Sequence, residues 1–233
     1  MLLDEFLDRT AAFGRPARTY LLREMSALLF HHPRPPDAAA LGDGSGHTVL
    51  IIPPLLTSDA VMWQLHRFLK HCGFRTAGWG QGINWGPTPR ALAGLRTRLC
   101  ELSANAREPV SVVGISMGGM MARDLAHDHP KHIRQVITVA SPVTFPTATT
   151  IEPLFRLLAP SYSRDIDVAR LGRRPPVPTM ALYSSDDGIV DWQSCRADTG
   201  DEPSYDVGGA HVTICRNPET LRRVALRLLD TSI

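Results

Sequence analysis

A Gly-x-Ser-x-Gly stretch constrains this chain more than any other feature. The apolar run at 110–115 leads directly into Ser116, and a helical pattern begins at Met117. This is the layout of a nucleophile elbow, a sharp strand-to-helix turn that exposes one serine hydroxyl. Gly114 and Gly118 are needed because the strained turn leaves no room for side chains beside the serine. If Ser116 occupies such a turn, we expect an enzyme that attacks an acyl carbon.

Strand and helix signals alternate through most of the chain. Apolar runs and β-favouring residues predict strands at 48–52, 75–79, 110–115, 135–140, 178–184 and 204–207. Apolar residues at helical spacing predict helices at 59–71, 89–102, 117–129 and 218–229. Such alternation is typical of an α/β fold with a mostly parallel central sheet and helices on both faces.

The N-terminal segment stands apart from this pattern. Residues 1–40 are predicted to form a helical arm and a proline-containing linker ahead of the main domain at 41–233. One apolar face of the arm consists of Leu21, Leu22, Met25, Leu28 and Leu29. We expect the arm to pack on the main domain. Pairing of two subunits into a homodimer and contact with a lipid surface are the alternatives.

An insert at about 142–178 interrupts the alternation of strands and helices. It is rich in proline and contains a predicted short helix at 151–158. An excursion over the carboxyl edge of a sheet is typical of a lid on an active site. A plain surface loop is the alternative.

Composition and charge exclude several classes of protein. The 233 residues, 43% of them apolar, suit one α/β domain with a substantial core. The net charge of +2 comes from interspersed charges without a basic stripe, so we expect no nucleic-acid partner. No run of 18 apolar residues predicts a membrane span, and the acidic start does not resemble a signal peptide, so we expect a cytoplasmic protein. The four cysteines are expected to be reduced core residues.

A nucleophilic serine needs a base within hydrogen-bond reach, and that base needs an orienting acid. The acid is expected just after a strand, between the serine and the histidine in chain order. Asp186, Asp187 and Asp191 all follow the fifth predicted strand. We favour Asp187, because it stands at the turn itself and Ile189 and Val190 can shield it from water. Asp191 is expected to cap the next segment and Asp186 to face solvent.

His211 is the predicted base. It follows the last strand signal, and the adjacent Gly208 and Gly209 free the backbone so that the ring can reach over the sheet edge. Five of the other histidines precede Ser116, which is the wrong order, and three lie at the end of the following helix or just beyond it.

The oxyanion of an acyl-transfer intermediate needs preorganised donors. One is expected from the backbone N–H of Met117, directly after the serine. The other is expected from the loop after the first strand, where Pro53 and Pro54 have no N–H to donate. The first available donor is therefore Leu55, with Leu56 as the near alternative.

An irregular stretch at 78–87 contains four glycines and two tryptophans, Trp79 and Trp85. The tryptophans either anchor the packing of this loop or line an apolar pocket. We predict that the substrate's acyl group contacts four apolar side chains: Leu56, Trp85, Phe145 and Leu154.

Together these motifs resemble the α/β-hydrolase superfamily. The resemblance covers roughly residues 47–230 and rests on the Pro-Pro-Leu-Leu loop at 53–56, the elbow at 114–119, the Ser-Ser-Asp-Asp turn at 184–187 and Gly-Ala-His at 209–211. The elbow, the acidic turn and Asn-Trp-Gly-Pro at 84–87 are similar to small bacterial lipases and esterases. The resemblance implies a Ser116–His211–Asp187 triad that hydrolyses esters through an acyl-enzyme without a cofactor or metal. The family usually has His-Gly or Pro-Gly where this chain has Pro53-Pro54.

The sequence therefore predicts a serine hydrolase acting on a small-molecule ester with an apolar acyl group. An acyltransferase or thioesterase would use the same three residues, and Arg156, Arg164 or Arg173 could give it a basic mouth. A non-catalytic protein that binds a ligand or partner is the third reading.

Overall fold

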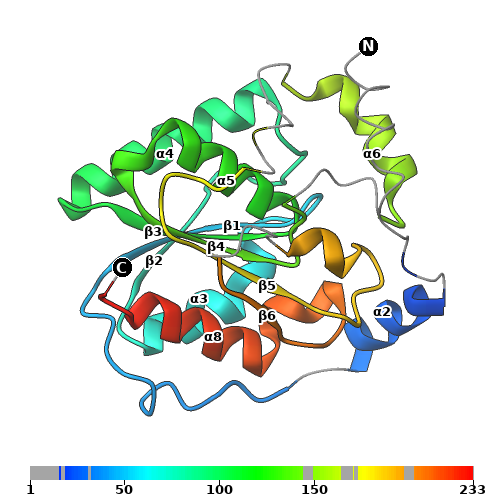
Figure 1. The fold of residues 1–233 in the computed structure, drawn as a ribbon, viewed down its shortest axis with the longest axis horizontal. Coiled ribbons are helices and arrows are strands. Elements are labelled where there is room, and N and C mark those ends of the chain that lie inside the picture. Colours follow the sequence, from blue (N-terminus) through cyan, green and yellow to red (C-terminus); the bar gives the residue numbers. More distant parts are fainter. Residues whose placement is uncertain are drawn as a thin grey trace.

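The computed structural model describes residues 16, 19–30, 33–143, 149–163, 170, 173–196 and 202–232. These residues form a six-stranded sheet with the order β2-β1-β3-β4-β5-β6, in which every pair of neighbouring strands is parallel (Figure 1). The strands are β1 (Thr48–Ile52), β2 (Arg75–Gly78), β3 (Val110–Ile115), β4 (Ile133–Val139), β5 (Thr179–Tyr183) and β6 (Ser204–Asp206). The predicted parallel α/β fold is confirmed.

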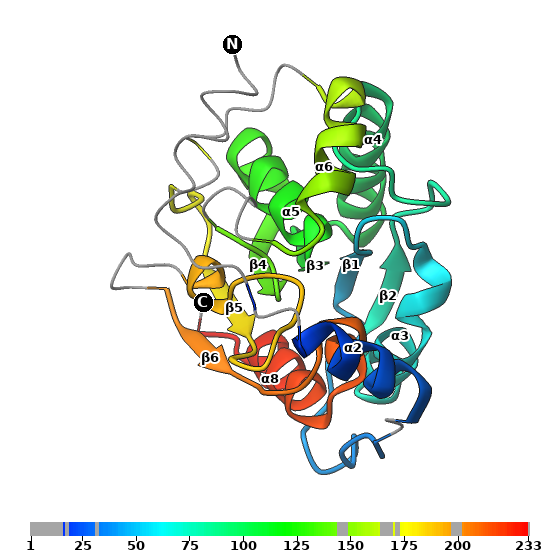
Figure 2. The same ribbon diagram turned by 90° about the vertical axis from the view of Figure 1, so that its right-hand side faces the viewer.

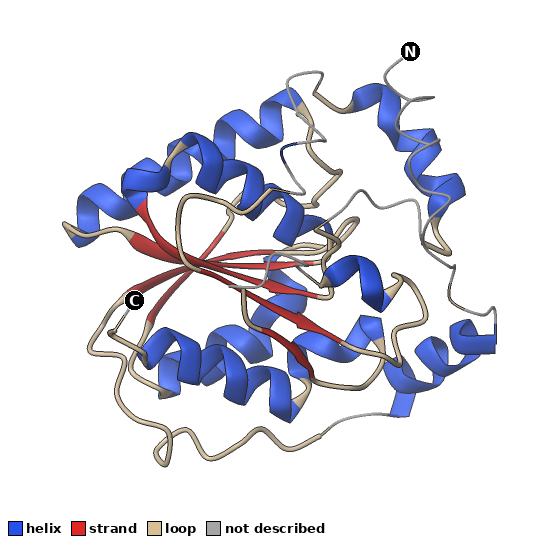
Figure 3. Ribbon diagram, in the orientation of Figure 1, coloured by secondary structure: helices blue, strands red, loops and turns tan. Residues whose placement is uncertain are grey.

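Helices cover both faces of this sheet. Helices α4 (Pro89–Ala106) and α5 (Met117–Asp128) lie on one face, and α3 (Trp63–His71) and α8 (Pro218–Leu229) lie on the other (Figures 1 and 3). Side chains alternate along a strand, so β1 contributes to two cores. Val49 and Ile51 belong to the core under α3 and α8, whereas Leu50 and Ile52 belong to the core under α4 and α5. All four β1 side chains are fully buried.

The strand order creates one crevice in the sheet. The chain goes from β1 outward to β2 and then returns to the other side of β1 as β3. Ligands of open α/β sheets bind at such a reversal, beyond the carboxyl ends of the strands. Ile52 of β1 is in register with Gly114 of β3, so the loop after β1 and the turn after β3 start level with each other.

Local signals explain why the helix limits were largely predictable. Helix α4 starts at Pro89 behind Thr88, whose side chain accepts a hydrogen bond from Ala91 N at 3.1 Å. Helix α8 starts in the same way at Pro218 behind Asn217, which accepts from the backbone of the next turn at 2.8 Å. Helix α4 ends at Ala106, four residues later than predicted, and Arg107 follows in the left-handed conformation.

Helix α2 of the arm packs on the main domain through a polar contact. Helix α2 (Thr19–Phe30) lies against η5, the 3-10 segment His211–Arg216 (Figure 2). Its apolar face is not covered in this contact: Leu22, Met25 and Leu29 are 77%, 59% and 62% exposed. The buried side chain of α2 is Glu24, which is 4% exposed. A carboxylate faces inward because it finds backbone N–H donors there.

The insert is described only in part. It contains α6 (Glu152–Leu158) followed by η3 (Ala159–Ser161), close to the predicted helix at 151–158. Phe155 of α6 is buried in the core that covers β1 and α5, whereas Leu157 is 76% exposed. The lid therefore stays a prediction for this segment.

Three shorter 3-10 segments complete the described elements: η1 (Asp59–Met62), η2 (Pro130–His132) and η4 (Trp192–Cys195). Across the described ranges, no helix has the length and apolar character needed to cross a membrane. All four cysteines are free thiols, and burial raises the pKa of Cys72, Cys195 and Cys215, the last to about 11. Raised pKa values disfavour the reactive thiolate at these sites.

Candidate active site

Ser116 occupies a strained turn between β3 and α5. Its backbone has φ 51° and ψ −121°, in a region that residues other than glycine rarely adopt. The turn is held from both sides, since Ser116 N donates to Val139 O at 2.8 Å and Gly119 N donates to Ser116 O at 2.9 Å. Ser116 is partly exposed, while the ten residues that follow it are buried. This is the geometry expected of a nucleophile elbow.

The glycines of the elbow are required by close backbone contacts. A Cβ atom on Gly114 would collide with the backbone of Gly118 and Gly119. A Cβ atom on Gly118 would collide with the carbonyl oxygens of Ile52 and Pro53. The elbow therefore lies directly against the loop after β1, as the strand register requires.

Asp187 lies in the turn after β5. It is 5% exposed, and its Oδ1 atom accepts hydrogen bonds from the backbone N–H groups of Ile189 and Val190, both at 2.8 Å. These two bonds fix the carboxylate, so that Oδ2 points away from its own turn. Asp187 Oδ2 lies 2.7 Å from His211 Nδ1.

The two neighbouring acids have other partners. Asp191 accepts a hydrogen bond from Gln193 N at 3.1 Å and so caps η4. Asp186 pairs at the surface with Arg23 of α2, at 2.9 Å. Of the three candidate acids, Asp187 is the one that contacts His211.

His211 is the first residue of η5, five residues after β6 ends at Asp206. The preceding Gly208 and Gly209 have φ of 63° and 89°, which side-chain-bearing residues rarely adopt. Ser184 Oγ donates to Gly209 O at 2.5 Å and so links this loop to the acid turn. Because β3, β5 and β6 are parallel, Ser116, Asp187 and His211 all follow the carboxyl ends of their strands at one edge of the sheet.

The charges around His211 favour its protonated form. Burial alone would lower the pKa of His211, since the imidazolium loses water. The charge and hydrogen bond of Asp187, together with the charge of Glu24, outweigh burial and raise this pKa above its ordinary value of 6.5. The arrangement stabilises a histidine that accepts a proton.

The two predicted donors of the loop after β1, Leu55 N and Leu56 N, differ in their partners. Leu56 N donates to Asn84 O at 2.7 Å, which removes it as a donor to a ligand. Within the described ranges, no hydrogen bond is made by Leu55 N. Asn84 is fully buried and fixes this loop, because its Nδ2 donates to Pro53 O at 2.7 Å and its Oδ1 accepts from Gly86 N at 2.9 Å.

Comparison with known proteins agrees with this geometry. A family profile described as alpha/beta hydrolase fold matches residues 98–175, a range that includes Ser116 and ends before Asp187 and His211. No curated protein matches the sequence. The chain has the α/β-hydrolase fold.

Several solved structures are similar to this chain in fold at low sequence identity. A mature lipase of Bacillus licheniformis is 15% identical over 80% of this chain and 94% of its own, with a TM-score of 0.61. A putative aryl esterase of Burkholderia cenocepacia is 15% identical over 80% and 90% of the two chains, with a TM-score of 0.58. The thioesterase domain from the curacin biosynthetic pathway is 16% identical over 79% and 92%, with a TM-score of 0.58.

The predicted acyl-contact residues differ in their surroundings. Trp79 is 2% exposed and donates to Gly82 O at 2.9 Å, so it anchors the packing of its loop. Trp85 is 53% exposed and lines a surface hollow of about 460 Å³ beside the start of α4. Leu56 is 39% exposed, Leu154 is partly buried on α6, and Phe145 lies outside the described residues.

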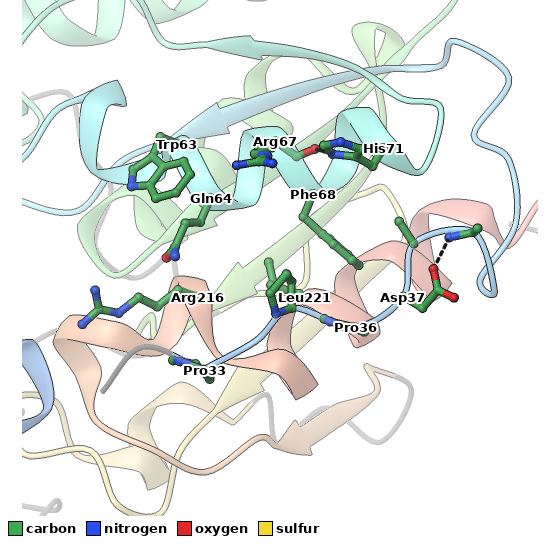
Figure 4. Close-up of a pocket in the computed structure, with 13 residues that line it drawn as sticks. Pro33, Pro36, Asp37, Trp63, Gln64, Arg67, Phe68, His71, Arg216 and Leu221 are labelled. Carbon is green, nitrogen blue, oxygen red and sulfur yellow. Dashed lines mark hydrogen bonds between the residues drawn. The ribbon is translucent and has the colours of Figure 1, made fainter. Parts of the chain in front are cut away.

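A second hollow lies away from the predicted site. It has a volume of about 550 Å³ between α3, α8 and the linker that follows α2 (Figure 4). Trp63, Arg67 and His71 come from α3, and Leu221 comes from α8. None of the predicted site residues lines it.

Sequence reasoning missed two buried polar residues of this region. In the sequence, Asn84 is indicated only as part of the Asn-Trp-Gly-Pro resemblance, and its buried amide is what holds the Leu55 loop. The sequence signal for Glu24 is weaker: it is the one carboxylate of the predominantly apolar helical stretch at 19–30.

Proposed function

We propose that this protein is a serine hydrolase that cleaves carboxylic esters with an apolar acyl group through an acyl-enzyme intermediate. The observation that carries the proposal is the buried 2.7 Å hydrogen bond between Asp187 Oδ2 and His211 Nδ1, at the sheet edge where Ser116 occupies a positive-φ elbow. A buried acid–histidine pair at the same sheet edge as a strained serine supports activation of the serine hydroxyl as a nucleophile.

The reaction starts with the hydroxyl of Ser116. His211 accepts the hydroxyl proton as Ser116 Oγ attacks the ester carbonyl, and Asp187 stabilises the resulting imidazolium. The backbone N–H groups of Met117 and Leu55 donate to the oxyanion of the tetrahedral intermediate. His211 then gives the proton to the departing alcohol, and a water molecule activated in the same way hydrolyses the acyl-enzyme.

Apolar surroundings support an apolar acyl group. Leu55 packs against the core that includes Met117 and Phe155, and Leu56 exposes part of its side chain at the surface of the same loop. An acyl chain that binds along this loop would remove apolar surface from water, which favours binding by roughly 25 cal/mol per Å².

Thioester cleavage or acyl transfer is the second candidate, because the same three residues would perform either reaction. The similarity in fold to a thioesterase domain keeps this candidate open. Of the arginines predicted for a basic mouth, Arg156 and Arg173 are exposed, and Arg164 lies outside the described residues. A non-catalytic binding protein is the third candidate, and the buried acid–histidine pair speaks against it.

A fluorophosphonate probe tests the proposal, because it reacts with an activated serine. We expect the wild-type chain to be labelled and to turn over p-nitrophenyl esters, and Ser116→Ala to lose both properties while it keeps the wild-type melting temperature. The exposed Ser185 supplies a matched control, Ser185→Ala, which should keep both. Turnover that survives in Ser116→Ala would end the proposal. Ester and thioester substrates of matched acyl length would then separate the first two candidates.

A further inference from the structure

Hydrophobic burial does not explain the position of helix α2. Its large apolar side chains are all among the exposed ones, from 38% at Leu21 to 81% at Phe30. Glu24 is the buried residue of the helix, at 4% exposure. A buried carboxylate costs free energy unless hydrogen bonds compensate for the lost water. The partners of Glu24 therefore decide where the helix lies.

All three of its backbone partners belong to the turns that carry the proposed acid and base. Glu24 Oε1 accepts from Gly188 N and from His211 N, both at 2.8 Å. Glu24 Oε2 accepts from Val212 N at 2.9 Å. Hydrogen bonds to a charged acceptor are stronger than those between neutral groups. One side chain from the arm thus joins the residue after Asp187 to His211 itself.

Further contacts fix α2 on the same two turns. A Cβ atom on Gly188 would lie 2.8 Å from Tyr20 Cβ and 3.0 Å from Glu24 Cγ, so the helix approaches this closely only because residue 188 is glycine. At the other turn, Arg216 Nη2 donates to the carbonyl oxygens of Ala27 and Leu28, at 3.2 Å and 3.3 Å.

We propose that Glu24 is a positioning residue for the proposed hydrolase reaction: its carboxylate holds the Asp187 turn and the His211 turn at a fixed separation. This inference rests on the proposed function. The Asp187–His211 hydrogen bond must survive while His211 gains and loses a proton, and a shared backbone anchor keeps the two residues together through that cycle. Misplacement of a catalytic group by 1 Å can cost about 100-fold in rate.

The charge of Glu24 should affect the pH profile of activity, which a side chain that only packs would not change. The charged groups that act on His211 are Asp187 on the turn after β5 and Glu24 on α2. Asp191 is buried near Asp187, and Arg23 and Asp186 form an exposed pair beside the turn. Because both carboxylates raise the pKa of His211 against the effect of burial, removing the charge of Glu24 lowers that pKa. The acidic limb of kcat/KM then moves to lower pH.

The decisive variant is Glu24→Gln, which keeps the shape of the side chain and removes its charge and one acceptor. We expect kcat for a p-nitrophenyl ester to fall by about 10- to 100-fold, with a smaller change in KM and an acidic limb at lower pH. The matched control is Arg23→Gln on the same helix, which removes an exposed ion pair and should keep the wild-type pH profile. Glu24→Asp keeps the charge with a shorter reach, so kcat should fall while the limb stays near its wild-type pH.

Backbone hydrogen exchange tests the anchor without any substrate. The amides of Gly188, His211 and Val212 should exchange faster in Glu24→Gln than in the wild-type chain, at conditions where both are folded by thermal melting. If Glu24→Gln does not fold, the same measurements on Glu24→Asp decide. Wild-type exchange, kcat and pH profile in these variants would overturn the inference and leave the proposed function intact. A wild-type chain that a fluorophosphonate does not label would instead overturn the proposed function, and the inference with it.

Discussion

Asp187 Oδ2 lies 2.7 Å from His211 Nδ1, and both side chains are less than a tenth exposed. The other oxygen of the same carboxylate is held by two backbone N–H groups. One oxygen of the Asp187 carboxylate therefore binds its own turn, and the other binds the histidine. Because Nδ1 of His211 is occupied by Asp187, Nε2 is the ring atom that can accept the proton of the proposed nucleophile.

Replacing the acid should damage the reaction more than the fold. In Asp187→Asn, the amide can present its N–H to His211 Nδ1 and so favour the tautomer with the proton on Nε2, which cannot accept the proton of Ser116. If the proposed function holds, we expect kcat for an ester to fall by about 10⁴-fold, as in a serine protease whose triad acid is replaced by asparagine. Steady-state kinetics on the purified variant measures this loss. Asp186→Asn, which alters the exposed neighbour, is the control, and similar losses in both variants would contradict the assignment.

The pH dependence of activity follows from the raised pKa of His211. His211 must be neutral to accept a proton, so kcat/KM should rise with pH through a limb whose midpoint lies above 6.5. A pH profile measured with a substrate that does not ionise checks this limb. A midpoint below 6.5 would show that the negative charges of Asp187 and Glu24 do not outweigh burial.

The raised pKa of His211 should also make the free energy of unfolding depend on pH. A histidine whose pKa is raised in the folded state contributes stability that is fully present below its unfolded pKa of about 6.5 and is lost as pH rises through the folded value. Burial lowers the pKa of His47, His66 and His127, and these residues act in the opposite direction. The contribution of His211 is therefore the difference between the wild-type chain and His211→Asn in urea unfolding. That difference should shrink as pH rises above 6.5, and a difference that grows would contradict the sign.

Loss of the Asn84 side chain should loosen the Leu55 loop. Asn84→Ala leaves the carbonyl of Pro53 and the N–H of Gly86 without their buried partner, at a cost of about 1–3 kcal/mol for each group. We expect a lower free energy of unfolding and a kcat reduced by 10-fold or more, since the proposed oxyanion donor moves with the loop. Urea unfolding and ester kinetics measure the two effects. Ile83→Ala, at an exposed neighbour in the same loop, is the control.

A side chain at Gly188 should push α2 away from the acid turn. In Gly188→Ala, the new methyl group would clash with Tyr20 Cβ and Glu24 Cγ. Overpacking of this kind typically lowers the free energy of unfolding by about 1–3 kcal/mol. We expect faster proteolysis within residues 19–30 and a lower melting temperature. Leu22→Ala, at a 77% exposed position of α2, should leave both unchanged. Equal rates of proteolysis within residues 19–30 in Gly188→Ala and the wild-type chain would contradict the view that α2 needs a glycine at residue 188 to pack on the acid turn.

Local chemistry in the sequence determined the elements and the elbow. The limits of β1, β3 and α8 agree with prediction, because apolar runs, a proline after a capping residue and Gly-x-Ser-x-Gly act over a few neighbouring residues. Chain order and flanking glycines predicted His211 as the base, and the place of Asp187 at its turn favoured it over its neighbours. The structure brings these two side chains into contact.

Only the tertiary structure decided which face of α2 is buried and which N–H of the 53–56 loop stays free. Periodicity indicated one apolar face that includes Leu22, Met25 and Leu29. The side chain that faces inward is instead Glu24, because backbone N–H groups of two turns far away in the chain meet at that place. Leu56 N is bonded because Asn84 arrives from another loop. A periodic pattern of apolar residues depends only on neighbours in the chain. The hydrogen-bond partners of a buried polar group depend on which distant segments the fold brings together.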